Sequence, residues 1–239
     1  MYTNALLLAL AASPLVAAHG KIAVVSGDAG GNGTGIGIMG GVVPGPGKNK
    51  VTEVDTTVFG KTDIQTDGLG KTNGNGKNTV AMVKMAMAQS GDTLPQVSST
   101  GGSISGTYHI VTTDGAGPIK AVLDPTGTGA FSTGTMLDVT TQVPGKGGNI
   151  KPSKRSLWTR GMDMIMKRAS NVNEDYPMAF SVPAGTTCQG SMAGQENVCL
   201  VKIANSNNAG PFGGVIAIQM AGASASNSTT KREAKNFSA

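Results

Sequence analysis

Several kinds of residue are scarce in this chain. Only two cysteines, two histidines and one tryptophan occur among 239 residues, and charged residues make up 14% of them. So few charges, together with 36 glycines, favour strands and turns over amphipathic helices. No apolar stretch of about 20 residues occurs either, so we expect no helical membrane span.

The N-terminal segment is typical of a signal peptide. Residues 1–18 carry no charged side chain, and the apolar run at residues 5–12 is too short to cross a bilayer. Val16 and Ala18 occupy the −3 and −1 positions of a signal-peptidase site, where small residues are preferred. We therefore predict that residues 1–18 are removed, that the mature chain begins at His19, and that the protein is secreted.

Secretion bears on the cysteines and on three glycosylation sequons. In an oxidising compartment Cys188 and Cys199 are expected to form a disulfide. Closing so short a loop contributes about 3 kcal/mol in the chain-entropy model. Asn-x-Ser/Thr sequons begin at Asn32, Asn227 and Asn236, and in a secreted protein they are candidate surface glycosylation sites.

The remaining pattern predicts a mainly β protein. Runs rich in β-branched residues recur between Gly, Pro and Asp turn signals, which favours an antiparallel β-sandwich with long loops and one or two short helices. Asn78 is the expected N-cap of the first helix. The sandwich domain is expected to span residues 19–221, followed by a disordered tail at 222–239. Strands are expected at residues 21–26, 106–113, 119–123, 136–143, 178–182, 198–204 and 214–220, and helices at 78–89 and 153–169.

Two segments have an unusual composition. Residues 27–47 contain several Gly-x-Gly patterns, but no clear helix follows them, so we expect a long surface loop and no nucleotide site. Basic residues are concentrated between residues 146 and 168, which indicates a solvated loop suited to an anionic cell wall. Trp158 is the single aromatic residue there, so we expect no nucleic-acid partner. Proteolytic cleavage at Lys154-Arg155 or Lys167-Arg168 stays open.

The positions of the two histidines suggest a metal site. After cleavage, His19 would offer its α-amino nitrogen and its ring Nδ1 to one ion, and His109 would add a third nitrogen. Three such nitrogens suit copper(II) and its tetragonal preference. Side chains alternate along a strand, so His109 should point away from the face that carries Tyr108 and Ile110. The alternative is an ordinary strand histidine and a terminal residue with no ligand role.

Four segments carry a resemblance to known proteins: residues 105–118 (SGTYHIVTTDGAGP), 122–125 (VLDP), 199–205 (CLVKIAN) and 209–214 (AGPFGG). With the mature start His19-Gly20, they resemble the Egh-like virulence factors of fungi, which are secreted proteins associated with appressoria and host penetration. More widely, the chain is similar to histidine-brace copper proteins, the group that includes lytic polysaccharide monooxygenases. The resemblance implies an immunoglobulin-like or monooxygenase-like sandwich with copper held by His19 and His109. It also implies that Phe212 or Tyr176 occupies the axial position of the copper site, and that Gln219 forms a second-sphere hydrogen bond there.

Two functions fit these observations. One is copper-dependent, monooxygenase-like oxidation of cuticle or cell-wall polysaccharide during surface penetration. The other is non-catalytic copper binding, or adhesion to a host surface. In both, the expected partner is an extracellular polysaccharide or a host or cell-wall surface, and we expect a monomer. No serine-hydrolase site competes, because the chain has no Gly-x-Ser-x-Gly elbow.

Overall fold

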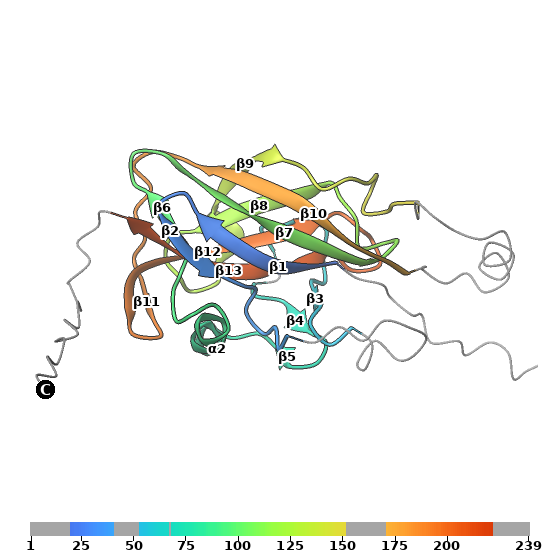
Figure 1. Ribbon diagram of the computed structural model, residues 1–239, viewed down its shortest axis with the longest axis horizontal. Helices are drawn as coiled ribbons and strands as arrows, with labels where there is room; N and C mark the ends of the chain where they lie inside the picture. The colour runs from blue at the N-terminus through green and yellow to red at the C-terminus, as the bar shows by residue number, and fades with distance from the viewer. Residues whose placement is uncertain (1–19, 41–52, 67, 152–170, 222–239) are drawn as a thin grey trace, which may run out of the picture.

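The computed structural model describes residues 20–40, 53–66, 68–151 and 171–221 (Figure 1). The predictions for residues 1–18, 153–169 and 222–239, and for both dibasic pairs, fall outside these residues. Within them the mainly β class with few short helices is confirmed. The helical segments are η1 (Val80–Met82), α2 (Val83–Ala88) and η2 (Phe131–Thr133). The strands are β1 (Gly20–Gly27), β2 (Gly30–Gly33), β3 (Thr57–Val58), β4 (Lys71–Thr72), β5 (Gly76–Lys77), β6 (Gln96–Ser98), β7 (Gly102–Thr112), β8 (Ile119–Asp124), β9 (Thr135–Thr141), β10 (Asn171–Val182), β11 (Gly190–Met192), β12 (Gln195–Asn205) and β13 (Phe212–Ala221).

Seven of the strands form a closed β-barrel, which corrects the prediction of a two-sheet sandwich. They are hydrogen-bonded in the order β12-β8-β9-β10-β7-β1-β13, and pairing of β12 with β13 closes the circuit. The seven strands expected from the sequence are these same seven. Strands β1 and β13 are paired in parallel, through Lys21 and Gly213. All other neighbouring strands of the barrel are paired antiparallel. Closure leaves neither β1 nor β13 with an unpaired edge there.

The barrel interior is the main hydrophobic core. Along β7, Ile104, Tyr108 and Ile110 point inward and are fully buried, while Ser105, Thr107 and His109 point outward, as strand alternation requires. The inward faces of the other strands complete this core with Ile22, Leu123, Leu137, Met178, Phe180, Val201, Ile203, Ile216 and Ile218. Tyr108 donates a hydrogen bond from its hydroxyl to the carbonyl of Phe212 at 3.2 Å, which ties β7 to the start of β13.

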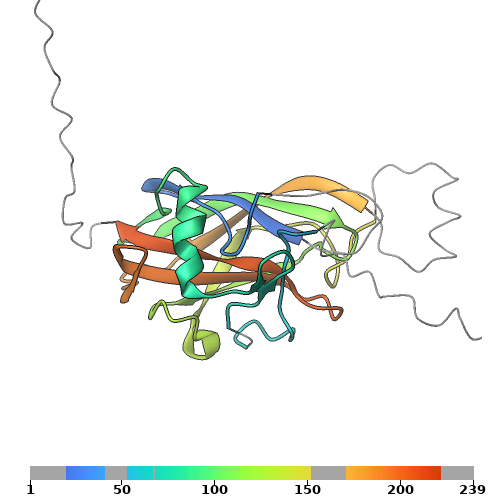
Figure 2. The same cartoon turned by 90° about the horizontal axis from the view of Figure 1, so that it is seen from below.

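A second core covers the outer side of β8, β12 and β13. Strand β12 is buried on both faces, since Cys199 and Val201 face the barrel interior while Val198 and Leu200 face outward. Helix α2 lies across these strands (Figure 2), and its side chains Val83, Ala86 and Met87 belong to the second core together with Ile36, Phe59, Ile64, Leu94 and Phe131. One side of the barrel is therefore covered by the chain itself.

Two local predictions need correction. Residues 27–47 do not form a long surface loop throughout, because residues 30–33 form strand β2 and Ile36 is fully buried in the second core. The expected helix occurs as η1 and α2, but Asn78 does not cap it. Its carboxamide instead donates to the Leu69 carbonyl at 3.1 Å and accepts from the Thr72 hydroxyl at 2.9 Å. Asn78 thereby ties the helix entry to the β3–β5 segment.

The disulfide between Cys188 and Cys199 is confirmed, with Cα atoms 4.9 Å apart. It anchors the segment before β11 to the middle of β12, and both cysteines lie in the barrel core. Among the described residues, no helix is long and apolar enough to cross a membrane.

Candidate functional site

One end of the barrel brings together the start of β1, the end of β7 and the segments that follow β7 and β12. Two buried asparagines hold this end together. Asn205 donates to the Ala116 carbonyl at 2.8 Å and accepts from the Phe212 N–H at 2.9 Å. Asn207 donates to the Asp114 carbonyl at 2.9 Å and accepts from the Ala209 N–H at 2.8 Å. Both side chains satisfy backbone groups that would otherwise be buried without partners.

His109 lies at this end of the barrel, on the outward face of β7 as predicted. Its side chain is 16% exposed, and its Nδ1 lies 2.6 Å from a carboxylate oxygen of Asp175, the residue paired with it on β10. A carboxylate only accepts hydrogen bonds, so this contact places a proton on Nδ1. The carboxylate therefore fixes the tautomer and the orientation of the ring.

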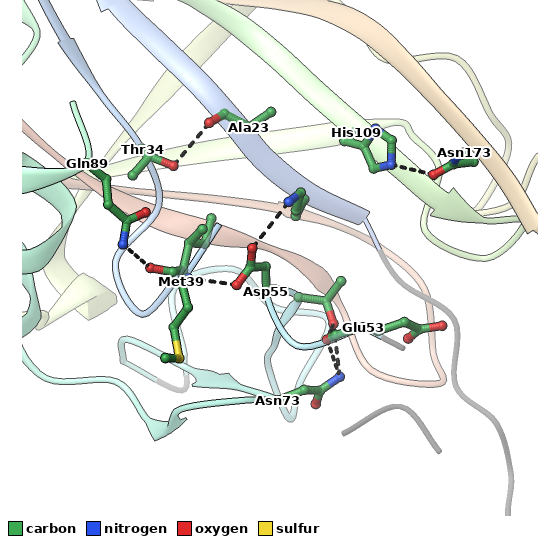
Figure 3. A network of polar contacts seen from close by, with 12 residues as sticks. Ala23, Thr34, Met39, Glu53, Asp55, Asn73, Gln89, His109 and Asn173 are labelled. Atoms are coloured by element: carbon green, nitrogen blue, oxygen red, sulfur yellow. Dashed lines mark hydrogen bonds and ion pairs between the residues drawn. The ribbon is translucent and has the colours of Figure 1, made fainter. Parts of the chain in front are cut away.

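The second ring nitrogen of His109 has a weaker partner. Nε2 lies 3.0 Å from the side-chain oxygen of Asn173, on the neighbouring strand in Figure 3. With the proton of a neutral ring on Nδ1, Nε2 and this oxygen are both acceptors, so the contact is not a hydrogen bond in that tautomer. Asn173 has a left-handed backbone with φ of 54°, at a register shift between Asn171 and Glu174. Asparagine tolerates this conformation better than most residues. The carboxamide of Asn173 is exposed, so it can turn away from Nε2 and leave that nitrogen free to bind a ligand.

The start of β1 lies directly beside His109. Gly20 pairs with Ile110, and Lys21 pairs with His109. A Cβ atom at Gly20 would lie 2.3 Å from the hydroxyl oxygen of Tyr108 and 2.4 Å from the Gly115 carbonyl, so the close approach requires glycine. The small residue after His19 thus allows β1 to begin against the buried Tyr108.

A charged pair anchors the start of β1. Lys21 Nζ lies 3.4 Å from Asp55, whose other carboxylate oxygen accepts the Met39 N–H at 2.7 Å. Gln89 at the end of α2 donates to the Ile38 carbonyl at 2.8 Å. Figure 3 shows these contacts in a row between β1 and α2. They hold residues 38–39 against the strand that begins at Gly20.

The axial candidates do not gather around His109. Tyr176 pairs with Tyr108, one residue along from the His109–Asp175 pair, so alternation places it on the opposite face of β10 from Asp175. Its hydroxyl donates to Glu174 at 2.5 Å, and this hydrogen bond raises the pKa of Tyr176 to about 12. Phe212 is fully buried, whereas His109 faces outward.

Gln219 lies at the other end of β13. It is six residues beyond Gly213, the residue paired with Lys21, which corresponds to about 20 Å along a strand. Its side chain donates to the Glu196 carbonyl and accepts from Gln96. The structure therefore does not bring Gln219 to the His109 site.

Of the sequons, Asn32 alone lies within the described residues. Its side chain is exposed on β2, and its Oδ1 accepts a hydrogen bond from the Ser26 hydroxyl at 2.8 Å. It lines an open groove of about 630 Å³ together with Lys21, Val24, Thr34, Ile38 and Gln89. Asn227 and Asn236 lie outside the described residues, and glycosylation at all three stays a prediction.

The residues around His109 fit a copper ligand set in one respect. A metal-binding histidine usually donates its second ring N–H to a carboxylate, as His109 does to Asp175. His19 lies outside the described residues, and within residues 20–40, 53–66, 68–151 and 171–221 no three His, Cys, Asp or Glu side chains cluster closely enough to hold a metal. The ligand set therefore depends on His19.

Sequence reasoning missed the residues that support the site. Asp175, Asn173 and Asp55 carry no motif, and the pairing that brings Asp175 to His109 joins strands separated by β8 and β9 in the chain. Asn205 lies within the 199–205 segment, but its role is visible only once the segments that follow β7 and β12 meet. The alternation of side chains along residues 171–182 was the one feature of the sequence that could have indicated the orientation of Asp175.

The fold and site define a small, disulfide-bonded β-barrel protein with an outward-facing histidine beside the start of its first strand. The chain belongs to the Egh16-like virulence factor family, whose match covers residues 17–213. It is 39% identical over 212 residues to the appressoria-specific virulence factor GAS1 of Pyricularia oryzae strain 70-15, across 88% of this chain and 75% of that protein. The appressoria-specific virulence factor GAS2 of the same fungus is 36% identical over 117 residues, which is 48% of this chain and 34% of GAS2. No solved structure matches the chain significantly.

Proposed function

We propose that this protein is a secreted, virulence-associated protein whose mature N-terminus binds one copper(II) ion through His19 and His109. We further propose that this site serves oxidation of cuticle or cell-wall polysaccharide during surface penetration. The observation that carries the proposal is the hydrogen bond from His109 Nδ1 to Asp175, beside the start of β1. Membership of the family and the likeness to GAS1 support the virulence role.

The strand register supports a shared site. His19 is bonded to Gly20, so its Cα is about 3.8 Å from that of Gly20. Because Gly20 pairs with Ile110, we expect His19 to reach the part of β7 that carries His109. The two imidazoles and the free α-amino group then supply three nitrogen ligands, the set that copper(II) prefers.

Each neighbouring residue has a definable part in this site. Asp175 holds the proton on Nδ1 and thereby presents Nε2 of His109 to the ion. Gly20 admits the chain start beside Tyr108, and the Lys21–Asp55 pair fixes the next residue. Copper, when bound, supplies one-electron redox chemistry with O2 or peroxide. Phe212 and Tyr176 stay predictions as axial groups.

A second candidate function is non-catalytic copper binding or adhesion to a host surface. It is favoured by the burial of Phe212 and by the position of Tyr176 on the opposite face of β10 from Asp175, because neither aromatic ring lies beside His109 as a monooxygenase-like site would require. In that case the ion would be held or delivered without turnover.

Copper titration of the mature protein tests the proposal. The protein would be made in a secretory host, its first residue confirmed as His19 by mass spectrometry, and copper(II) binding followed by calorimetry and EPR. We expect one-to-one binding with a three-nitrogen EPR signature. His109→Ala should lose this signature, and Asp175→Asn should keep it with an affinity about 10- to 100-fold lower, the usual effect of a second-shell change.

The sharpest control is a His19→Ala chain with the same first position. It keeps the α-amino group and His109 but loses the imidazole that chelates the ion together with that amine, so it should bind copper far more weakly. Equal binding by this chain, or by His109→Ala, would refute the copper site. If copper binds as expected, ascorbate-driven release of oxidised oligosaccharides from wall polymers separates the enzyme from the binding protein.

A further inference from the structure

The side of the barrel formed by β7, β9 and β10 carries no second layer in the described part of the chain (Figure 1), and β1 at its border faces the groove lined by β2 and the end of α2. The opposite side is covered by α2 and the second core. On the open side, Ser105 and Pro177 are exposed, and Val24 is 45% exposed. The outward residues here meet solvent although the strands beneath them are long and regularly paired.

Hydroxyl side chains form a regular array on this side. Ser105 of β7 is opposite Ser26 of β1 and Ala179 of β10, and Ala179 is opposite Thr141 of β9. Ser103 is opposite Ser181 in the next outward row. We call this surface the hydroxyl face, and define it by Ser103, Ser105, Thr107, Thr141 and Ser181.

The hydroxyl groups of this face are available to a partner. Elsewhere among the described residues several hydroxyls are bonded internally, as in the bonds from Thr34 to the Ala23 carbonyl and from Thr66 to the Asp63 carbonyl. Among the described residues, the five hydroxyls of the hydroxyl face form no side-chain hydrogen bond to the protein. Rows repeat about every 7 Å along a strand and about every 4.8 Å across strands. The face therefore offers evenly spaced groups, each both donor and acceptor.

The composition of the face favours a neutral polysaccharide as its partner. Protein interfaces are rich in aromatic residues, arginine and methionine at their centres, whereas this face is built mainly of Ser, Thr, Ala and Pro, with Asp138 opposite Ser181 at its β9 edge. Sugar polymers present many uncharged hydroxyls, which can pair with serine and threonine without the burial of any charge. Val24 and Pro177 flank Thr107 in one row and offer apolar contact to the C–H surface of a sugar ring.

We infer that the hydroxyl face binds a neutral cell-wall polysaccharide and lays it along the barrel toward His109. The row next to Thr107 is formed by Lys21, His109 and Asp175, so a polymer on the face would reach the proposed copper site. The inference rests on the proposed extracellular role and names the substrate class of that site. It does not require copper for binding.

The test measures binding without metal. The mature, EDTA-treated protein would be incubated with insoluble chitin, cellulose and β-1,3-glucan, and with polygalacturonate as an anionic polymer, at low and high salt. We expect salt-insensitive binding to at least one neutral polymer. Ser105→Arg/Ser181→Arg should weaken this binding about tenfold or more, because it places two charges against an uncharged partner. Ser105→Ala/Ser181→Ala should weaken it about threefold for each hydroxyl removed.

The matched control is Ser132→Arg/Thr133→Arg, which adds the same charge at exposed positions of η2, on the covered side. It should bind like the wild type, and circular dichroism confirms that all variants fold. Equal binding by the face variants and the control would overturn the inference, as would binding confined to polygalacturonate and lost in high salt. Copper titration of Ser105→Arg/Ser181→Arg should be unchanged, so failure of the face and failure of the copper site give different results.

Discussion

Replacement of Asn205 by alanine should destabilise the barrel end on which the candidate site is built. Asn205 is 3% exposed, and its carboxamide forms two well-placed hydrogen bonds, at 2.8 Å to the Ala116 carbonyl and at 2.9 Å from the Phe212 N–H. Longer contacts, each of 3.3 Å, join it to the Asp114 carbonyl and to the Asn207 N–H. The short bonds dominate the energetic argument because hydrogen bonds weaken with length.

The magnitude follows from the two groups that the substitution leaves behind. Ala116 and Phe212 are both fully buried, so their carbonyl and N–H cannot turn to bulk water. Each buried group left without a partner costs about 1–3 kcal/mol. A water molecule that enters the space of the lost carboxamide would reduce this cost. We therefore expect Asn205→Ala to lower the free energy of unfolding by about 3 kcal/mol.

Urea unfolding followed by fluorescence and circular dichroism measures this loss, with Asn208→Ala as the matched control. Asn208 is exposed in the same loop and forms no side-chain hydrogen bond among the described residues, so its substitution should change stability by less than about 0.5 kcal/mol. A double-mutant cycle with Asn207→Ala should show coupling, because both carboxamides hold the Asp114 carbonyl. A loss below about 1 kcal/mol, or equal to that of Asn208→Ala, would refute the reasoning.

Three further predictions follow from other contacts. Gly20→Ala forces Tyr108 or Gly115 to move, and overpacking of this kind costs about 1–3 kcal/mol. The thermal unfolding midpoint should therefore fall by several degrees, and an unchanged midpoint would show that β1 can shift at no cost. Cys188→Ser/Cys199→Ser should lose about 3 kcal/mol, and reduction of the wild type should lower its stability to that of the variant. Partial burial raises the pKa of Asp28, but hydrogen bonds from Ser98 and Ser103 outweigh it and hold the pKa below its ordinary value. The stability that Asp28 contributes is thus present above the pKa of its unfolded state and is lost as the pH falls through the pKa of its folded state. The difference in free energy of unfolding between the wild type and Asp28→Asn, measured in urea, should therefore become smaller from pH 6 to pH 3.

The sequence was sufficient to locate the barrel strands and to orient His109. Runs rich in β-branched residues between Gly, Pro and Asp turn signals identified all seven strands. Alternation placed His109 on the face opposite Tyr108, and the structure shows that this face is the outer one. Alternation within one strand carries no information on its partners, so closure through the parallel contact between Lys21 and Gly213 could not be predicted. The short strands β2 to β6 and β11 are two to four residues long and mostly glycine-rich or polar, too short to show a period.

Lys202 shows why the second core was also missed. A lysine between Val201 and Ile203 is typical of a solvent-facing position, yet Lys202 is fully buried. Its ammonium group donates to the Thr66 carbonyl and lies 4.2 Å from the centre of the Phe59 ring and 5.6 Å from that of Phe131. The signal was present in its neighbours, because Val198, Leu200 and Ala204 make this face of β12 apolar, as expected of a strand buried on both sides.

The segments that carry the family resemblance are explained largely by structure, and this decides which residues test the function. Residues 199–205 and 209–214 build the barrel end through Asn205, whose carboxamide needs only backbone partners. A relative can therefore keep these segments and the fold without any metal. His109 lies within the resembling segment 105–118, but Asp175, which orients it, lies outside all four segments. A copper function accordingly predicts that His19, His109 and Asp175 occur together in relatives that bind copper, and that relatives without Asp175 keep the barrel but bind copper weakly.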